Sequence, residues 1–292
     1  MADTFFDKIK NIDRRVIFTF IALSVIVPLL LNIKFTEKGS PIVQNIFDKV
    51  ESLPAGSRVL ISMDYGPSTV PEIQPMVNAL VRHCNERNLK MFYMCLWATG
   101  QNLTTLTVDS VQVKEFPEKQ YGIDYVNLGY KAGNEGLINV LLTDMKKMYT
   151  TDVSGTYIDD IEIMKPVRNL TSFDLIFGLG GGTPGIKEWI LFAGDPGNVP
   201  IAGGCTAVQA PLLYPYWPNQ LLGLMGGIKG AAEYESLLIK HYPKYKDKSN
   251  PGIQMMGPQA IAHIVIMLFI IIGNVTFFIE RSREKSGKGR VG

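Results

Sequence analysis

Residues 58–67 read RVLISMDYGP, and this stretch decides the fold. Its first six residues suit a short buried strand, and the Asp, Gly and Pro that follow are typical of a loop. Pro71 then opens a segment whose apolar residues recur at helical spacing: Ile73, Met76, Val77, Leu80, Val81 and Cys84. The stretch therefore predicts one β-α unit.

The same alternation recurs along the chain. Further strands are expected at 89–97, 125–129, 173–177 and 199–202, with helices at 134–149, 184–192 and 219–238. Residues 40–57 predict an amphipathic helix, and 156–163 (TYIDDIEI) alternate like an edge strand. Strands alternating with helices favour an α/β domain with a doubly wound, mostly parallel, Rossmann-like sheet.

Two apolar segments flank this domain. Residues 16–33 carry no charged group, and residues 260–279 carry only His263 as an ionisable group. About 20 apolar residues span the hydrocarbon core of a bilayer, so both segments are predicted to be transmembrane helices. A cleaved signal peptide is the alternative for the first segment, but no small-x-small cleavage site follows it. A buried core helix is the alternative for the second, but such helices rarely lack a polar face.

Basic residues lie outside both segments: Lys8, Lys10, Arg14, Arg15, Arg281, Arg283, Lys285, Lys288 and Arg290. This placement predicts a cell-membrane protein with two spans, both termini cytoplasmic and the central domain extracytoplasmic. The expected organisation is an N-terminus (1–15), first span (16–33), amphipathic connector (34–57), α/β domain (58–241), linker (242–259), second span (260–279) and basic tail (280–292).

Composition argues against several functions. The net charge of +2 is too small to indicate nucleic-acid binding. The three cysteines show no metal-ligand spacing and predict no disulfide framework. None of the three histidines falls in a predicted strand-end loop, so a catalytic base and a histidine-ligated metal are not expected. Asp159, Asp160 and Glu162 are interpreted as a solvated acidic face. The sequence therefore predicts neither an enzyme nor a bound cofactor or metal.

A glycine-rich loop offers one candidate ligand site. Gly180, Gly182 and Gly185 match G-x-G-x-x-G between a strand and a helix, a spacing that suits a diphosphate, although close packing alone explains it better. In parallel sheets, ligands bind beyond the carboxyl ends of the strands. The strand-end loops contribute four more candidates: Asp64, Tyr65, Thr183 and Thr206.

A second candidate region is an interface. In the helix predicted at 219–238, Gly223 with Gly227 and Gly226 with Gly230 would form a smooth stripe, open either to the domain's own sheet or to another subunit. The segment just before it, 211–218, is rich in proline and aromatic residues, which are favoured in interface cores. Its aromatic candidates are Tyr214, Tyr216 and Trp217.

These features lead to two hypotheses. The first is a membrane-anchored scaffold or assembly subunit whose extracytoplasmic domain self-associates or docks to a larger membrane complex. The alternative is an extracytoplasmic module that binds a small solute and reports it to the membrane. The expected partners are the lipid bilayer and either further copies of the chain or other membrane-complex subunits, without nucleic acid.

Overall fold

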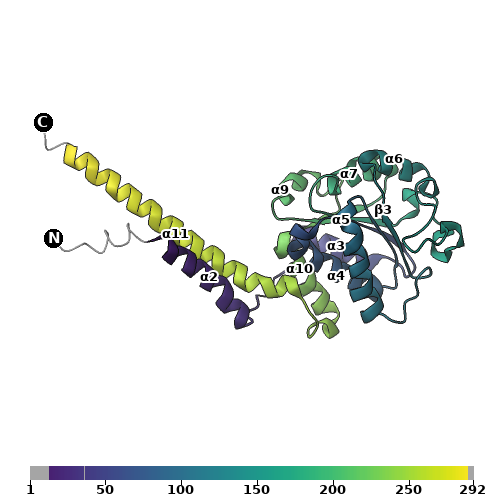
Figure 1. Cartoon of the computed structure of the whole chain (residues 1–292), viewed down its shortest axis with the longest axis horizontal. Coiled ribbons are helices and arrows are strands. Elements are labelled where there is room, and N and C mark those ends of the chain that lie inside the picture. The colour runs from purple at the N-terminus through teal and green to yellow at the C-terminus, as the bar shows by residue number, and fades with distance from the viewer. Residues whose placement is uncertain (1–12, 36, 289–292) are drawn as a thin grey trace. The chain divides into compact units, whose positions relative to one another are not determined.

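The computed structural model describes residues 13–35 and 37–288. The chain divides into two compact units. One contains the described residues up to Phe35 together with those from Gln254 onward, and the other is the domain Thr36–Ile253. Figure 1 shows the long helices of the first unit and the layered helices and strands of the second. Residues 1–12 and 289–292, which belong to the predicted basic termini, lie outside the described residues.

The domain is built on one six-stranded parallel sheet with the order β3-β2-β1-β4-β5-β6. The strands are β1 Arg58–Asp64, β2 Lys90–Cys95, β3 Tyr125–Tyr130, β4 Leu175–Gly180, β5 Ile201–Cys205 and β6 Gly223–Gly226. The winding direction reverses between β1 and β4, as in doubly wound folds. The predicted Rossmann-like α/β architecture is therefore confirmed.

Helices cover both faces of the sheet (Figure 1). One face packs against α3 Pro41–Ser52, α4 Val70–Glu86, α5 Ala98–Thr107 and α10 Gly227–His241. The other packs against α6 Asn134–Thr143, α7 Ile186–Trp189 and α9 Ala210–Leu213. Because side chains alternate along a strand, Val59, Ile61 and Met63 enter the first core, whereas Leu60 enters the second.

The prediction of one long helix at 219–238 is wrong. Residues Gly223–Gly226 form the edge strand β6, and α10 begins only at Gly227, whose φ is +59°. Four glycines weaken a helix by roughly 0.5–1 kcal/mol each relative to alanine, and Gly227 adopts a backbone conformation that suits glycine. Leu224 and Met225 then point to opposite cores, as successive residues of a strand do.

The prediction of an edge strand at 156–163 is also wrong. This segment forms two short turns, Ile158–Asp160 and Glu162–Met164. The carboxylate of Asp152 accepts hydrogen bonds from the amides of Ser154 (2.8 Å) and Thr156 (2.9 Å), which turns the chain before it can extend. The alternating pattern reflects burial of the apolar residues Ile158, Ile161 and Ile163 in the second core.

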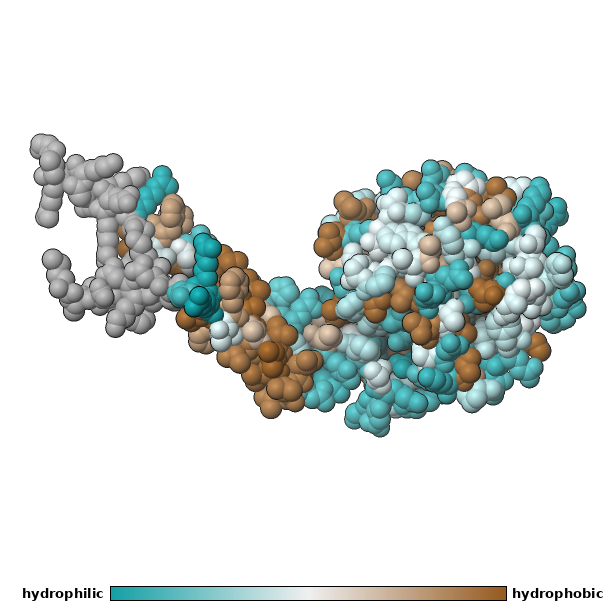
Figure 2. All heavy atoms as spheres, in the orientation of Figure 1, coloured by the Kyte–Doolittle hydropathy of each residue, from teal (hydrophilic) through white to brown (hydrophobic). Residues whose placement is uncertain are grey.

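The helical unit contains α2 Arg14–Leu30 and part of α11 Pro251–Lys288. Among the described residues one helix, Pro251–Ile279, is long and apolar enough to cross a membrane, which agrees with the second predicted span. The first predicted span also forms a helix, but α2 has 17 residues and contains Pro28. Only one of the two predicted spans is therefore supported by its length and composition. Figure 2 shows hydrophobic residues covering these helices.

The helices α2 and α11 pack against each other in opposite directions. The rings of Phe20 and Phe269 meet edge to face with centroids 6.3 Å apart. A Cβ added at Gly257 would lie 2.0 Å from the carbonyl oxygen of Ile33, so a glycine is required at this close approach. Phe20 of α2 meets Phe269 of α11, whereas Ile33, which follows α2, meets Gly257 near the start of α11. The two helices therefore run antiparallel.

The first three residues of α11 belong to the domain, where Glu235 binds their backbone. This buried carboxylate of α10 accepts hydrogen bonds from the amides of Gly252 (3.2 Å) and Ile253 (2.8 Å). It thereby satisfies helix-terminal amides that have no partner within the helix. α11 begins at Pro251, inside the predicted linker 242–259, and Tyr245 and Asn250 of that linker are buried.

Glu235 should make stability depend on pH. Burial raises its pKa from 4.5 to about 7, although the two amides and the nearby charge of Arg82 act in the opposite direction. The folded state therefore holds this proton more tightly than the unfolded state, and the stabilisation present below pH 4.5 is lost as the pH rises through 7. We expect the wild type to lose on the order of 3 kcal/mol relative to Glu235→Gln over this range. Urea unfolding of both proteins at several pH values measures the difference, and a pH-independent difference would contradict the assignment.

Candidate functional site

The strand ends bring several predicted ligand residues to one edge of the sheet. Asp64 at the end of β1 pairs in register with Gly180 at the end of β4, and Gly180 pairs with Cys205, which precedes Thr206. A Cβ added at Gly181 would lie 3.2 Å from the Cβ of Tyr65. These residues thus lie together at the carboxyl ends of the strands, as expected for a parallel sheet.

Asp64 is nevertheless fully buried, and its carboxylate is hydrogen-bonded by groups of its own domain. Its carboxylate accepts hydrogen bonds from the Ser62 hydroxyl (2.7 Å), the Leu96 amide (2.6 Å) and the Trp189 indole Nε1 (3.0 Å). Burial raises the pKa of Asp64 to about 6 against the effect of these donors. Tyr65 is also buried, and its hydroxyl donates to Gln74 (2.8 Å). Asp64 and Tyr65 therefore hold the strand ends together.

The glycine-rich loop also packs against its own domain. The amide of Gly181 donates to the Asp64 carbonyl oxygen (2.9 Å), and that of Gly185 donates to the Glu188 carboxylate (2.7 Å). The side-chain oxygen of Gln209, in its favoured orientation, accepts from the Gly182 amide (3.1 Å). A phosphate would need these amides free. The geometry favours close packing for this loop, and the hollow beside exposed Thr183 has a volume of only about 80 Å³.

The four glycines predicted to form a helical stripe do not do so, because Gly223 and Gly226 are the first and last residues of β6 and Gly227 and Gly230 lie in the first turn of α10. Added Cβ atoms would meet the domain's own chain in each case. They would lie 2.4 Å from the Ile42 carbonyl at Gly223, 2.9 Å from Ala210 at Gly226, 2.8 Å from Ala207 at Gly227 and 2.7 Å from Met225 at Gly230. The glycines permit close packing within the domain.

Three exposed apolar side chains lie on the connection between β5 and β6. Val208 is 86% exposed, Leu212 of α9 is 73% exposed and Tyr214 is 50% exposed. We call these three side chains the ridge. Figure 2 shows hydrophobic residues at the edge of the domain where Figure 1 places α9. Exposed apolar groups mark interaction surfaces where they form a contiguous patch.

A mainly apolar groove of about 470 Å³ adjoins the ridge. Its apolar lining comes from Ile42, Val43, Tyr214, Trp217 and Leu224. Its polar end is formed by Ser40, Lys229 and Glu233. Glu233 is buried there, where it accepts from the Ser40 amide (3.0 Å) and lies 3.4 Å from the Lys229 ammonium. Of the ridge residues, Tyr214 also lines this groove, whereas Leu212 lines the small hollow beside Thr183.

The predicted aromatic segment therefore contributes in part to this surface. Tyr214 is exposed and Trp217 lines the groove, whereas Tyr216 is half-buried against the second core. Val208 and Leu212 were not predicted, although both are apolar and only four residues apart in the sequence. That spacing would have placed them on one side of a helical turn.

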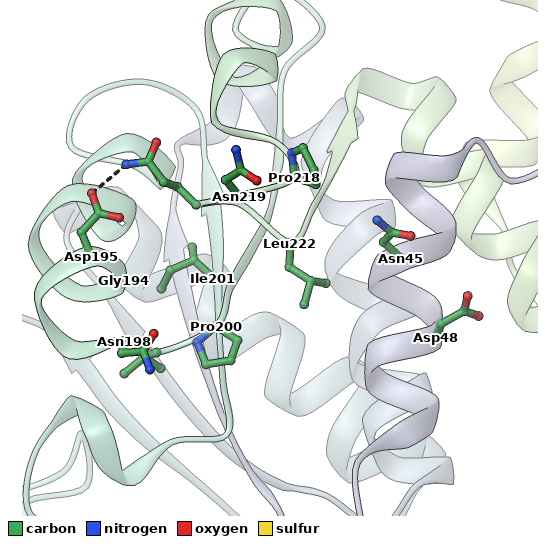
Figure 3. Close-up of a pocket in the computed structure, with 12 residues that line it drawn as sticks. Asn45, Asp48, Gly194, Asp195, Asn198, Pro200, Ile201, Pro218, Asn219 and Leu222 are labelled. Atoms are coloured by element: carbon green, nitrogen blue, oxygen red, sulfur yellow. Dashed lines mark hydrogen bonds between the residues drawn. The ribbon is translucent and has the colours of Figure 1, made fainter.

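A second, polar cavity of about 520 Å³ lies at the amino ends of β5 and β6. In Figure 3, Asn45 of α3 and Asn219 lie on either side of Leu222, which forms part of the floor. Gln220 donates to Asp195 (2.8 Å) at the rim. Amide groups both donate and accept hydrogen bonds, and among the described lining residues there is no lysine or arginine. The carboxylates of Asp48 and Asp195 also line it, so this cavity suits a small hydrogen-bonding solute that carries no negative charge.

The buried histidine His83 has a structural environment. It stacks on Phe47, its Nδ1 lies 2.7 Å from the Tyr234 hydroxyl, and its Nε2 lies 2.9 Å from the Glu51 carboxylate. Burial lowers the pKa of His83 to about 4, so the ring is neutral. A neutral ring donates from Nε2 to Glu51 and accepts from Tyr234 at Nδ1. This network links α3, α4 and α10.

Within the part of the chain that the structure describes, no group of three His, Cys, Asp or Glu side chains is arranged to hold a metal ion. Asp159 and Glu162 form exposed ion pairs with Lys146 and Lys165. The three cysteines are free and buried. Burial raises the pKa of each thiol to about 12, which disfavours the reactive thiolate.

Comparison with known proteins gives no matching family model and no similar curated protein.

Proposed function

We propose that this protein is a membrane-anchored assembly subunit whose α/β domain self-associates outside the membrane. The observation that supports this proposal is the ridge, three exposed apolar side chains on one connection, of which Tyr214 also lines an apolar groove. Apolar side chains in such a cluster gain stability when a partner removes them from water. The crevice at the strand ends is occupied by the domain's own side chains, so it offers less support for a ligand-binding function.

The proposal includes a two-pass anchor. α2 is roughly 26 Å long at 1.5 Å per residue, close to the ~30 Å hydrocarbon core, and it packs antiparallel to α11. An antiparallel pair places both chain ends on the same side. The basic residues Arg14, Arg15 and Arg281 favour the cytoplasm for that side.

Single cysteines test this topology, because the native cysteines are buried. A membrane-impermeant maleimide should label Lys248→Cys in intact cells and should label Asp13→Cys only after the cells are opened. The reverse pattern would place the domain in the cytoplasm, and labelling of both in intact cells would rule out two spans.

Self-association is tested by co-expressing two copies of the full-length chain with different affinity tags. Purification through one tag from detergent-solubilised membranes should recover the second tag as well. Mixing separately prepared extracts is the control for association after solubilisation. If the second tag is lost under gentle detergent conditions, the proposed function fails.

A small-solute module remains a second candidate because of the polar cavity at the amino ends of β5 and β6. A neutral sugar such as glucose, galactose, mannose or ribose matches its amide lining. One of these sugars should raise the melting temperature of the wild type, and Asn45→Leu together with Asn219→Leu should abolish the shift. An unchanged wild-type melting temperature with all four sugars would remove this candidate.

A further inference from the structure

We propose that the connection between α10 and α11 binds the headgroups of anionic lipids. Residues 240–250 read KHYPKYKDKSN, and we call them the basic loop. They carry four lysines and one aspartate, Asp247, which leaves an excess of three positive charges. The inference rests on the proposed membrane anchor and does not need the proposed self-association.

Most of these charges are exposed and have no acidic partner. The side chains of Lys240, Lys246 and Lys248 are exposed, and within the described part of the chain none of the three forms an ion pair. Lys244 differs, because its ammonium lies 2.8 Å from the Glu86 carboxylate. Three lysines of the basic loop are therefore available to a negatively charged partner.

The basic loop is held in one shape by contacts that do not use its lysine ammonium groups. The side-chain amide of Asn250 donates to the carbonyl oxygens of Tyr245 (2.8 Å) and Lys248 (2.9 Å). The Arg82 guanidinium of α4 donates to the Ser249 carbonyl oxygen (3.0 Å) and lies 5.7 Å from the centroid of the buried Tyr245 ring. The loop therefore presents its lysines from a fixed backbone.

The length of α11 favours a position of the basic loop at the lipid headgroups. The part of α11 that is long and apolar enough to cross a membrane, Pro251–Ile279, has 29 residues and is roughly 43 Å long at 1.5 Å per residue. A bilayer with both headgroup layers is about 40–45 Å thick. A helix that crosses both layers would begin in one of them, and Lys248 comes only three residues before Pro251.

The chemistry of lysine suits this partner. Its ammonium is a compact, strongly hydrated point charge on a flexible stem, which suits a layer of mobile phosphate groups better than one rigid ligand. Each lysine close to an anionic membrane surface strengthens binding roughly five-fold. Headgroups border a bilayer on both sides, so the contact forms on whichever side the domain lies. It would hold this part of the domain against the bilayer.

Lipid retention by the full-length protein tests the contact. The protein is reconstituted in nanodiscs that contain phosphatidylcholine and phosphatidylglycerol in equal amounts, and native mass spectrometry counts the lipids of each kind that stay bound. The loop variant carries Lys240→Gln, Lys246→Gln and Lys248→Gln. The matched control changes three exposed lysines on segments that pack on the second core: Lys147→Gln, Lys165→Gln and Lys187→Gln.

We expect the wild type and the control to retain severalfold more phosphatidylglycerol than phosphatidylcholine. The loop variant should retain about two-fold less phosphatidylglycerol than the control, since it lacks three lysines at the headgroups. The basic C-terminal tail contributes equally in all three proteins, so the comparison of the two variants isolates the loop. Raising the salt to about 1 M shortens the screening length from ~10 Å to ~3 Å and should remove the difference.

The outcomes separate this inference from the proposed function. A loop variant that retains as much phosphatidylglycerol as the control overturns the inference, while the anchor and self-association stand. Protein that does not enter the nanodiscs overturns the anchor and this inference together. Single chains that show the expected difference between the variants support this inference and contradict self-association.

Discussion

Replacing Leu212 by aspartate is expected to convert the associated protein to monomers. In the proposed self-association this exposed side chain leaves water for an apolar contact, where an unpaired carboxylate would be strongly disfavoured. Loss of a central contact residue costs about 2 kcal/mol or more, which corresponds to roughly 30-fold weaker association. Size-exclusion chromatography with light scattering on the detergent-solubilised protein measures the change in mass.

Leu106→Asp is the matched control for this experiment. Leu106 is nearly as exposed as Leu212, so both substitutions place a charge on a solvated surface and should leave the fold intact. Circular dichroism of both variants checks that they remain folded. If the two variants retain the same mass as the wild type, the ridge does not form the interface.

Replacing Asp64 by alanine should unfold the domain far more readily than any nearby substitution. The change leaves the Leu96 amide and the Trp189 indole buried without their acceptor, and it removes the partner of Ser62. Each orphaned donor costs about 1–3 kcal/mol, so the combined loss is on the order of 3 kcal/mol or more. The high pKa of Asp64 reflects a cost of burying its charge, and relief of that cost offsets part of the loss.

Urea unfolding of full-length protein measures this loss, with Ser62→Ala as a control that removes one hydroxyl donor but keeps the carboxylate. Asp64→Asn retains one acceptor oxygen and should fall between the other two variants. If Asp64→Ala were as stable as Ser62→Ala, Asp64 would not organise the strand ends. A role for its carboxylate in binding a solute would then regain support.

The central architecture was predictable because local patterns carry it. Each strand from β1 to β5 is an apolar run followed by a loop, and each run is buried on both faces of the sheet. β6 was missed because its glycines, Gly223 and Gly226, provide no apolar run, and the neighbouring helix has a similar composition. The alternating pattern at 156–163 correctly predicted which residues are buried. It did not predict the backbone conformation, because the turn around Asp152 prevents the segment from extending as a strand.

The candidate sites were harder to predict because their properties depend on residues distant in the sequence. Strand topology correctly placed Asp64 near Gly180. The partners of these groups come from later elements: Trp189 donates to the Asp64 carboxylate, and Gln209 accepts from the amide of Gly182 in the loop. The aromatic segment pointed to the correct connection. The exposure of Val208 and Leu212 depends on how α9 packs on the second core through Ala210 and Leu213, which no local pattern reveals.

Native mass spectrometry of the full-length protein, released from detergent under gentle conditions, tests the central claim most directly. The proposal predicts a dominant species with the mass of two or more chains, and conversion of this species to single chains by Leu212→Asp. A wild-type protein that appears only as a single chain, at concentrations where membrane proteins normally remain assembled, would contradict it.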